Sequence, residues 1–259
     1  MTQKIIIFVI LLAFSNIKLL AENETLYLSV ASSLYNLSKS LTSEWEKKTN
    51  IKTIVITGPT SLIARQIHNG QLSNLIITAN RDWLTWMEDR ELINIESISV
   101  IAKNSLVFSS GINQGFFIDI NSINFKENFK DQLSSSMFAI PHPSSVPLGI
   151  YAKQALKSLD LWNDLNGKLV FTSSSQSNLK FIEKGEAIIG ISYLSDTISS
   201  SKVLVVAKID DSIFPYEKPT YWAAKIKRNG NDNDFGFLEW LKSSEAQKII
   251  KNYGFETTE

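Results

Sequence analysis

The chain has 259 residues, 44% of them hydrophobic, with 26 basic and 26 acidic side chains. The absence of cysteine from the sequence excludes disulfides, a thiol nucleophile and thiolate metal sites, and the balanced charge without a basic stripe argues against nucleic-acid binding. Two histidines, His68 and His142, are too few for a typical histidine metal site. A chain of this length can bury a sizeable core and often forms two lobes.

Residues 1–21 are typical of a secretory signal peptide. Lys4 precedes an apolar run over residues 5–14, and the small residue Ala21 follows before a polar stretch. This order predicts cleavage near Ala21, with an uncleaved anchor as the alternative. The run is short for a membrane span, and no cysteine follows it to carry a lipid. We therefore expect an exported, soluble mature protein in the periplasm.

The first predicted strand and helix meet at the stretch Val30-Ala31-Ser32-Ser33-Leu34. Residues 25–30 are typical of a strand entering a core, and apolar side chains at positions 34, 37, 41 and 45 recur at helical spacing. Ser33 therefore lies near a helix start, where its hydroxyl can bond the free N–H groups of the first turn. These N–H groups and the helix dipole also attract anions, although an ordinary cap without a ligand is the simpler interpretation of this stretch alone.

The pattern of strand, small hydroxyl residues and helix then recurs. Residues 51–57 are typical of a second strand and lead into Gly58-Pro59-Thr60-Ser61, after which apolar residues return to helical spacing. Residues 75–79 predict a third buried strand followed by another helix, and residues 99–109 are predicted to be extended. This alternation favours α/β units on a mainly parallel sheet.

The second half of the chain repeats this alternation. It predicts strands over residues 137–140, 168–171, 187–193, 202–207 and 221–226. Residues 111–136 carry only a weak pattern, whereas helix starts are predicted near Pro147 and Ser175, and proline suits the first turn of a helix. Residues 235–252 predict a single amphipathic helix near the end of the chain.

Four predicted helix starts, near Ser33, Thr60, Pro147 and Ser175, therefore present free N–H groups, and three of them lie in hydroxyl-rich turns. In open α/β sheets such turns collect at the carboxyl ends of the strands, where ligands bind. Tyr193 stands at the exit of a further strand. Serine and threonine cap helices in many proteins, so this pattern alone does not identify a ligand.

Short segments across nearly the whole mature chain match the order and spacing of one family. They are Val30-Ala31-Ser32-Ser33-Leu34, Ile63-Ala64-Arg65-Gln66-Ile67, Leu75-Ile76-Ile77-Thr78-Ala79, Lys103-Asn104-Ser105-Leu106-Val107, residues 146–153, residues 190–196 and Tyr253-Gly254-Phe255. On these segments the chain resembles the periplasmic molybdate-binding proteins of bacterial molybdate ABC transporters. The resemblance implies an α/β, two-lobed periplasmic-binding-protein fold of type II. Each lobe is then a mainly parallel sheet flanked by helices, with lobe 1 over 22–103 and 208–259 and lobe 2 over 104–207.

The resemblance also implies a binding site. It assigns molybdate, or tungstate, to neutral donors: Ser33 and Thr60 through hydroxyl and backbone N–H, Leu148 and Ser175 through backbone N–H, and Tyr193 through its phenol. A tetrahedral dianion presents only acceptors, so a closed cleft of N–H and O–H groups can satisfy it without lysine or arginine. We expect no catalytic residue, no cofactor and no metal besides that of the oxyanion. The implied partners are membrane ABC permease subunits, and we expect a monomer that binds no nucleic acid.

Some residues depart from the family pattern, and other functions stay open. Pro59 removes one N–H from the second turn, so Ser61 could share or replace the role of Thr60. The same fold could bind another oxyanion, such as sulfate. A serine-dependent hydrolase would need Ser33 as nucleophile with His142 or His68 as base, but no Gly-x-Ser-x-Gly elbow surrounds Ser33. We therefore expect a binding protein rather than an enzyme.

Overall fold

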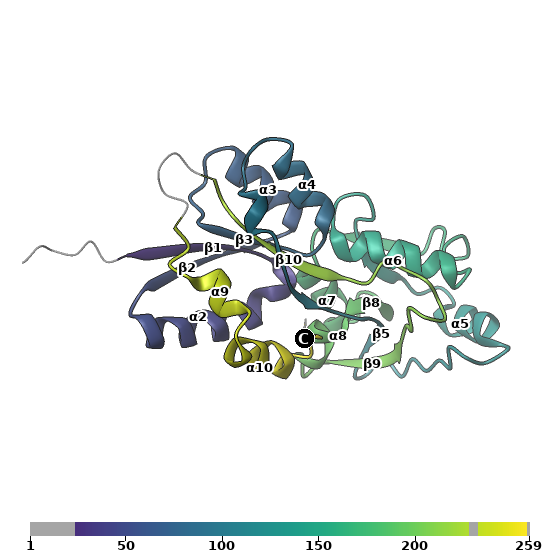
Figure 1. The fold of residues 1–259 in the computed structure, drawn as a ribbon. Helices are drawn as coiled ribbons and strands as arrows, with labels where there is room; N and C mark the ends of the chain where they lie inside the picture. The colour runs from purple at the N-terminus through teal and green to yellow at the C-terminus, as the bar shows by residue number, and fades with distance from the viewer. Residues whose placement is uncertain (1–23, 228–232, 258–259) are drawn as a thin grey trace, which may run out of the picture.

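A computed structural model describes residues 24–227 and 233–257 of the chain, which form two lobes side by side (Figure 1). The predicted signal peptide, residues 1–21, lies outside the described residues. None of the helices in the described ranges is long and apolar enough to cross a membrane.

The first lobe is built on a five-stranded sheet with the order β2-β1-β3-β10-β4. Its strands are β1 (Thr25–Ala31), β2 (Lys52–Gly58), β3 (Leu75–Thr78), β4 (Ser99–Lys103) and β10 (Thr220–Lys225). One face carries α2 (Tyr35–Thr49), α9 (Phe237–Leu241) and α10 (Ser244–Asn252), and the other carries α3 (Thr60–His68) and α4 (Arg81–Glu88). Two single 3₁₀ turns, η1 (Ser32–Leu34) and η2 (Ile95–Ser97), complete this lobe.

The second lobe repeats this plan with the strand order β7-β6-β8-β5-β9. Its strands are β5 (Leu106–Gly111), β6 (Phe138–Pro141), β7 (Leu169–Thr172), β8 (Ile189–Tyr193) and β9 (Val203–Lys208). Helices α5 (Phe125–Leu133) and α6 (Pro147–Ser158) pack on one face, and α7 (Ser175–Glu183) packs on the other. The short helix α8 (Leu194–Ile198) follows β8 directly.

Both sheets are mainly parallel, as predicted, with one strand reversed in each. In the first sheet β10 is antiparallel to β3 and β4, and in the second sheet β5 is antiparallel to β8 and β9. The reversed strands are those that follow the two crossovers between the lobes, residues 104–105 and 209–219. The division at residues 207 and 208 stays a prediction; Ile209, Phe214 and Tyr216 pack with the core of the second lobe.

Buried apolar side chains follow the predicted periodicities. The predicted face of α2 is buried, and the Trp45 ring packs edge-on against Phe237 at 5.4 Å between centroids and lies 5.5 Å from Trp240. In the second lobe, the Phe108 ring from β5 lies 5.8 Å from that of Phe129 and 6.2 Å from that of Phe138. Each lobe thus has its own apolar core, which holds the strand ends in place for a site between them.

Three predicted elements differ from the structure. The single helix over 235–252 is wrong, because Ser243 caps a new helix there: its hydroxyl accepts the Ala246 N–H at 3.4 Å. The extended stretch 99–109 divides into β4 and β5, which belong to different sheets. Helix α5 lies within the weakly patterned stretch 111–136, where only three apolar side chains of the helix are buried.

Candidate functional site

The five predicted site residues meet around one small cavity between the lobes. Ser33, Thr60, Leu148, Ser175 and Tyr193 all line it. The remaining lining residues are Ala31, Ser32, Ala79, Val146 and Pro147. The structure therefore brings the predicted donors together, while their binding of a ligand stays a prediction. Ser61 is buried but does not line the cavity, so the structure favours Thr60 as the second hydroxyl.

Two turns from the first lobe supply one side of the cavity. Ser33 lies in η1, directly after β1, and its Oγ accepts a hydrogen bond from the Tyr221 phenol at 2.9 Å. Thr60 is the first residue of α3, and its Oγ1 accepts the Ala79 N–H at 3.4 Å. The first N–H groups of a helix have no acceptor within the helix, so both turns offer donors to the cavity.

The start of α6 supplies the first donor from the second lobe. Pro147 is the first residue of this helix, as predicted, and Leu148 follows it. Gly149 allows the helix to begin close to the end of β6, because a Cβ there would lie only 2.3 Å from the carbonyl oxygen of Pro141. This close approach places Leu148, the second residue of the helix, in the wall of the cavity.

The start of α7 supplies the second donor from this lobe. Ser174 and Ser177 form a capping box, in which the Ser174 hydroxyl accepts the Ser177 N–H at 3.0 Å and the Ser177 hydroxyl accepts the Ser174 N–H at 2.9 Å. The box satisfies the third N–H of the helix and leaves that of Ser175 for the cavity. The side-chain hydroxyl of Ser175 lies 3.1 Å from that of Ser32, so the two lobes touch here.

Tyr193 is buried at the end of β8, and its phenol oxygen has no hydrogen-bond partner among the described residues. Burial raises the pKa of this phenol well above its usual value, so the phenol stays neutral and keeps its proton. A buried hydroxyl without a partner costs about 1–3 kcal/mol. An acceptor in the cavity would recover that free energy.

The cavity has an uncharged lining. None of the described residues that line it is a lysine, arginine, aspartate or glutamate. The buried carboxyl of Asp196, on α8, accepts a hydrogen bond from the Gln176 amide at 3.0 Å. Burial raises the pKa of Asp196 to about 8, against the side-chain hydrogen bonds of Ser175 and Gln176, which lower it. Near neutral pH this carboxyl is therefore mostly protonated and adds little negative charge beside the cavity.

Replacing Asp196 with asparagine is expected to flatten the pH dependence of stability between pH 5 and pH 8. The carboxyl titrates near 3.8 in the unfolded chain and near 8 in the folded one, so the folded state binds more protons between these values. Stability of the wild type must then fall as pH rises through this window. Denaturant unfolding of both proteins at several pH values measures the difference.

The nearby phenols of Tyr193 and Tyr221 have raised pKa values and do not titrate in that window. Other carboxyls contribute equally to both proteins and cancel in the difference. If the stabilities of wild type and Asp196→Asn change in parallel with pH, the carboxyl is ionised in the folded protein.

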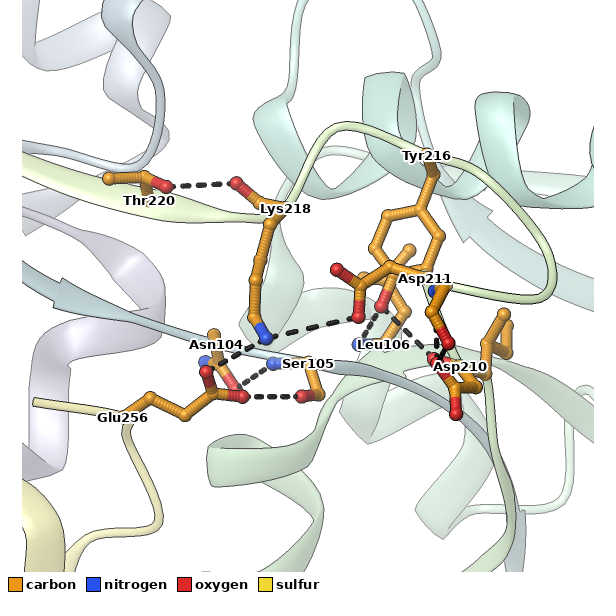
Figure 2. Close-up of polar contacts among 11 residues, drawn as sticks. Asn104, Ser105, Leu106, Asp210, Asp211, Tyr216, Lys218, Thr220 and Glu256 are labelled. Carbon is orange, nitrogen blue, oxygen red and sulfur yellow. Dashed lines mark hydrogen bonds and ion pairs between the residues drawn. The ribbon is translucent and has the colours of Figure 1, made fainter.

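The two crossovers between the lobes are joined by polar contacts with the C-terminal segment (Figure 2). The Glu256 carboxylate accepts from the Ser105 hydroxyl at 3.0 Å and pairs with the Lys218 ammonium at 2.8 Å. Its backbone also pairs with that of Lys103. Burial raises the pKa of Glu256, but the hydrogen bonds from Lys218 and Ser105 outweigh it and leave the pKa below its usual value. The Glu256 side chain thus contacts both crossovers.

Neither histidine is placed to serve Ser33 as a base. His68 packs its ring edge-on against Trp86, and the exposed His142 has its Nδ1 3.0 Å from the Ser144 hydroxyl. Neither lines the cavity. No group of three histidine, aspartate or glutamate side chains in the described ranges could hold a metal ion.

Sequence reasoning did not single out two residues that matter at the site. Tyr151, on α6, donates its phenol proton to the Ala79 carbonyl at 3.0 Å and so joins the lobes beside the cavity. Tyr221, on β10, lies 188 positions from Ser33 and contacts it only in the folded chain. The motif 146–153 contains Tyr151, but no spacing rule connects Tyr221 to the site.

Comparisons with known proteins agree with this arrangement. Residues 26–256 match the family model described as bacterial extracellular solute-binding protein. The Molybdate-binding protein ModA of Escherichia coli (strain K12) is 30% identical over 239 residues, which cover 91% of this chain and 90% of that protein.

Solved structures show the same fold. The substrate binding domain of a putative molybdenum ABC transporter from Clostridium difficile is 28% identical, with a TM-score of 0.68 over 91% of this chain and 99% of that one. The periplasmic molybdate-binding protein of Azotobacter vinelandii is 20% identical, with a TM-score of 0.77 over 90% of this chain and 100% of that one. The predicted two-lobed fold of type II is confirmed.

Proposed function

Because the chain belongs to the bacterial extracellular solute-binding proteins, we propose that it captures molybdate between its lobes and delivers it to an ABC permease. The molybdate-binding relative covers most of this chain and supports this choice of ligand. Tungstate, a dianion of the same shape, is the expected second ligand.

The observation that carries the proposal is the donor-rich cavity, where the described lining is uncharged and the Tyr193 phenol has no hydrogen-bond partner in the described part of the chain. The cavity is reached from both lobes by the starts of three helices, α3, α6 and α7, by the turn η1 and by the phenol. Molybdate has four oxygens that accept hydrogen bonds and none that donates, so this set of groups is complementary to it. Burying a dianion is costly unless its lone pairs are met, and charge-assisted hydrogen bonds are the strong ones.

We propose that the protein works as a monomer in the periplasm after cleavage near Ala21, without any cofactor and without catalysing a reaction. The ligand would bind in the open cleft, and rotation of the lobes about the two crossovers would enclose it. Its partners would then be the ligand and the permease subunits.

Titration calorimetry with molybdate, tungstate, sulfate and phosphate tests this function. We expect strong binding of molybdate and tungstate with one site per chain, weaker binding of sulfate, and a higher melting temperature with each bound ligand. Size and donor placement separate these anions, since the contacts to all five donor residues must be met together. Equal or tighter binding of sulfate would assign the protein to sulfate, and no binding of any oxyanion would contradict the proposal.

A further inference from the structure

A buried chain of hydrogen bonds leads from the crossover to the cavity. The amide nitrogen of Asn104 donates to the Tyr221 phenol oxygen at 3.4 Å, and that phenol donates to Ser33 Oγ at 2.9 Å. All three side chains are buried, and those of Asn104 and Tyr221 are fully inaccessible. Ser33 is the member that lines the cavity.

The backbone around Asn104 sets the donor-to-acceptor direction of these hydrogen bonds. Its Oδ1 accepts the N–H of Ser105 at 2.9 Å (Figure 2) and the N–H of Ser195 at 3.4 Å. A backbone N–H group can only donate, so the oxygen of the Asn104 side-chain amide must face these two N–H groups. The nitrogen therefore faces the other way, toward the Tyr221 phenol and the Ser195 hydroxyl, which it meets at 2.8 Å.

The bond from Asn104 in turn directs the hydroxyl protons of Tyr221 and Ser33. The Tyr221 oxygen accepts from Asn104, so its own proton is free to point at Ser33. Ser33 Oγ accepts that proton, and a hydroxyl has only one proton of its own to give. The hydroxyl proton of Ser33 therefore points away from Tyr221 and can be donated to a ligand in the cavity.

We propose that Asn104 and Tyr221 are positioning residues that hold Ser33 as a donor toward the cavity and so favour fully deprotonated oxyanions over protonated ones. The inference rests on the proposed function, since it concerns how the same cavity chooses its ligand. An oxyanion that carries a proton needs an acceptor. Ser33, with one lone pair taken by the Tyr221 proton, instead turns its own proton toward the ligand and meets it as a donor.

The test is a double-mutant cycle with Ser33→Ala and Tyr221→Phe, read by calorimetry with molybdate and with phosphate at pH 6. Phenylalanine keeps the ring that packs on Phe255 at 5.3 Å and removes only the hydroxyl. We expect Tyr221→Phe to weaken molybdate binding about tenfold, which is the size of one hydrogen bond to a charged group. In the Ser33→Ala background the same change should have no further effect, because Tyr221 acts through Ser33.

Selectivity gives a readout that loss of packing would not change. At pH 6 phosphate carries protons, and the ratio of molybdate to phosphate affinity should narrow several-fold in Tyr221→Phe. The matched control is Tyr216→Phe, which removes a phenol that donates to the Ile209 carbonyl at 3.1 Å and does not line the cavity. This control should keep wild-type affinity and selectivity.

Asn104→Asp provides a second variant with its own pH signature. An ionised carboxylate at this position accepts from Tyr221 and draws the phenol proton away from Ser33, so molybdate affinity should fall further as pH rises. Additive losses in the double mutant, or an unchanged affinity ratio in Tyr221→Phe, would overturn the inference while leaving the proposed function intact. A wild-type protein that does not bind molybdate would instead overturn the proposed function itself.

Discussion

Replacing Tyr193 with phenylalanine is expected to weaken molybdate binding by about 1.5–3 kcal/mol, or roughly 10- to 100-fold. The phenol is buried in the wall of the cavity without any other hydrogen-bond partner in the described part of the chain, so its proton has no competing use. Because no protein acceptor loses a donor, the ligand-free variant should melt at or above the wild-type temperature. Calorimetry and thermal melts with and without molybdate measure both effects.

Tyr216→Phe is the matched control for this variant. The Tyr216 phenol oxygen also accepts the Leu106 N–H at 3.2 Å, so its loss removes one hydrogen bond from each of two backbone groups. This control should melt at a lower temperature and bind molybdate normally. A Tyr193→Phe protein with wild-type affinity would remove the phenol from the binding site.

Replacing Gly149 with alanine is expected to damage both the fold and the site. The new Cβ would lie 2.3 Å from the carbonyl oxygen of Pro141 and 2.6 Å from that of His142, and these backbone atoms cannot rotate away. The start of α6 must shift, which costs about 1–3 kcal/mol or more. The shift also carries the Leu148 N–H out of position, so molybdate affinity should fall more than about tenfold. Thermal melts and calorimetry on the folded protein separate the two losses.

Leu148→Ala distinguishes damage to the fold from damage to the site. It truncates a buried side chain and should cost about 2–5 kcal/mol of stability, yet it keeps the backbone N–H that is the proposed donor. The folded fraction should therefore retain most of its affinity for molybdate. Equal losses of affinity in Leu148→Ala and Gly149→Ala would argue against a backbone donor at this position.

The sequence predicted the sheets and three of the residues that line the cavity for one common reason. Parallel strands end at the same edge of a sheet, so a turn after each strand brings its first helical residues to that edge. Ser33, Thr60 and Ser175 each follow a strand of such a sheet, and that local rule was enough to place them close together. The resemblance to a family supplied the backbone role of Leu148 and the phenol of Tyr193.

Features that depend on contacts distant in sequence could not be read in this way. The pairing of Tyr221 with Ser33 arises because β10 returns from the second lobe and inserts between β3 and β4. The break at Ser243 was hidden because α9 and α10 pack on the same core, which makes their apolar residues look like one periodic helix. Both depend on tertiary packing, which no short window of sequence contains.

The uncharged lining of the cavity also has a kinetic consequence. Among the described residues the lining carries no fixed positive charge, so the cavity attracts a dianion only through the short-range dipoles of its helix starts, and the rate of encounter should depend little on ionic strength. Retention must then come from slow dissociation, because every donor has to be released before the anion can leave. The residence time of the bound anion is thus set by the rate at which the lobes open. A membrane partner that separates the lobes would therefore control its release.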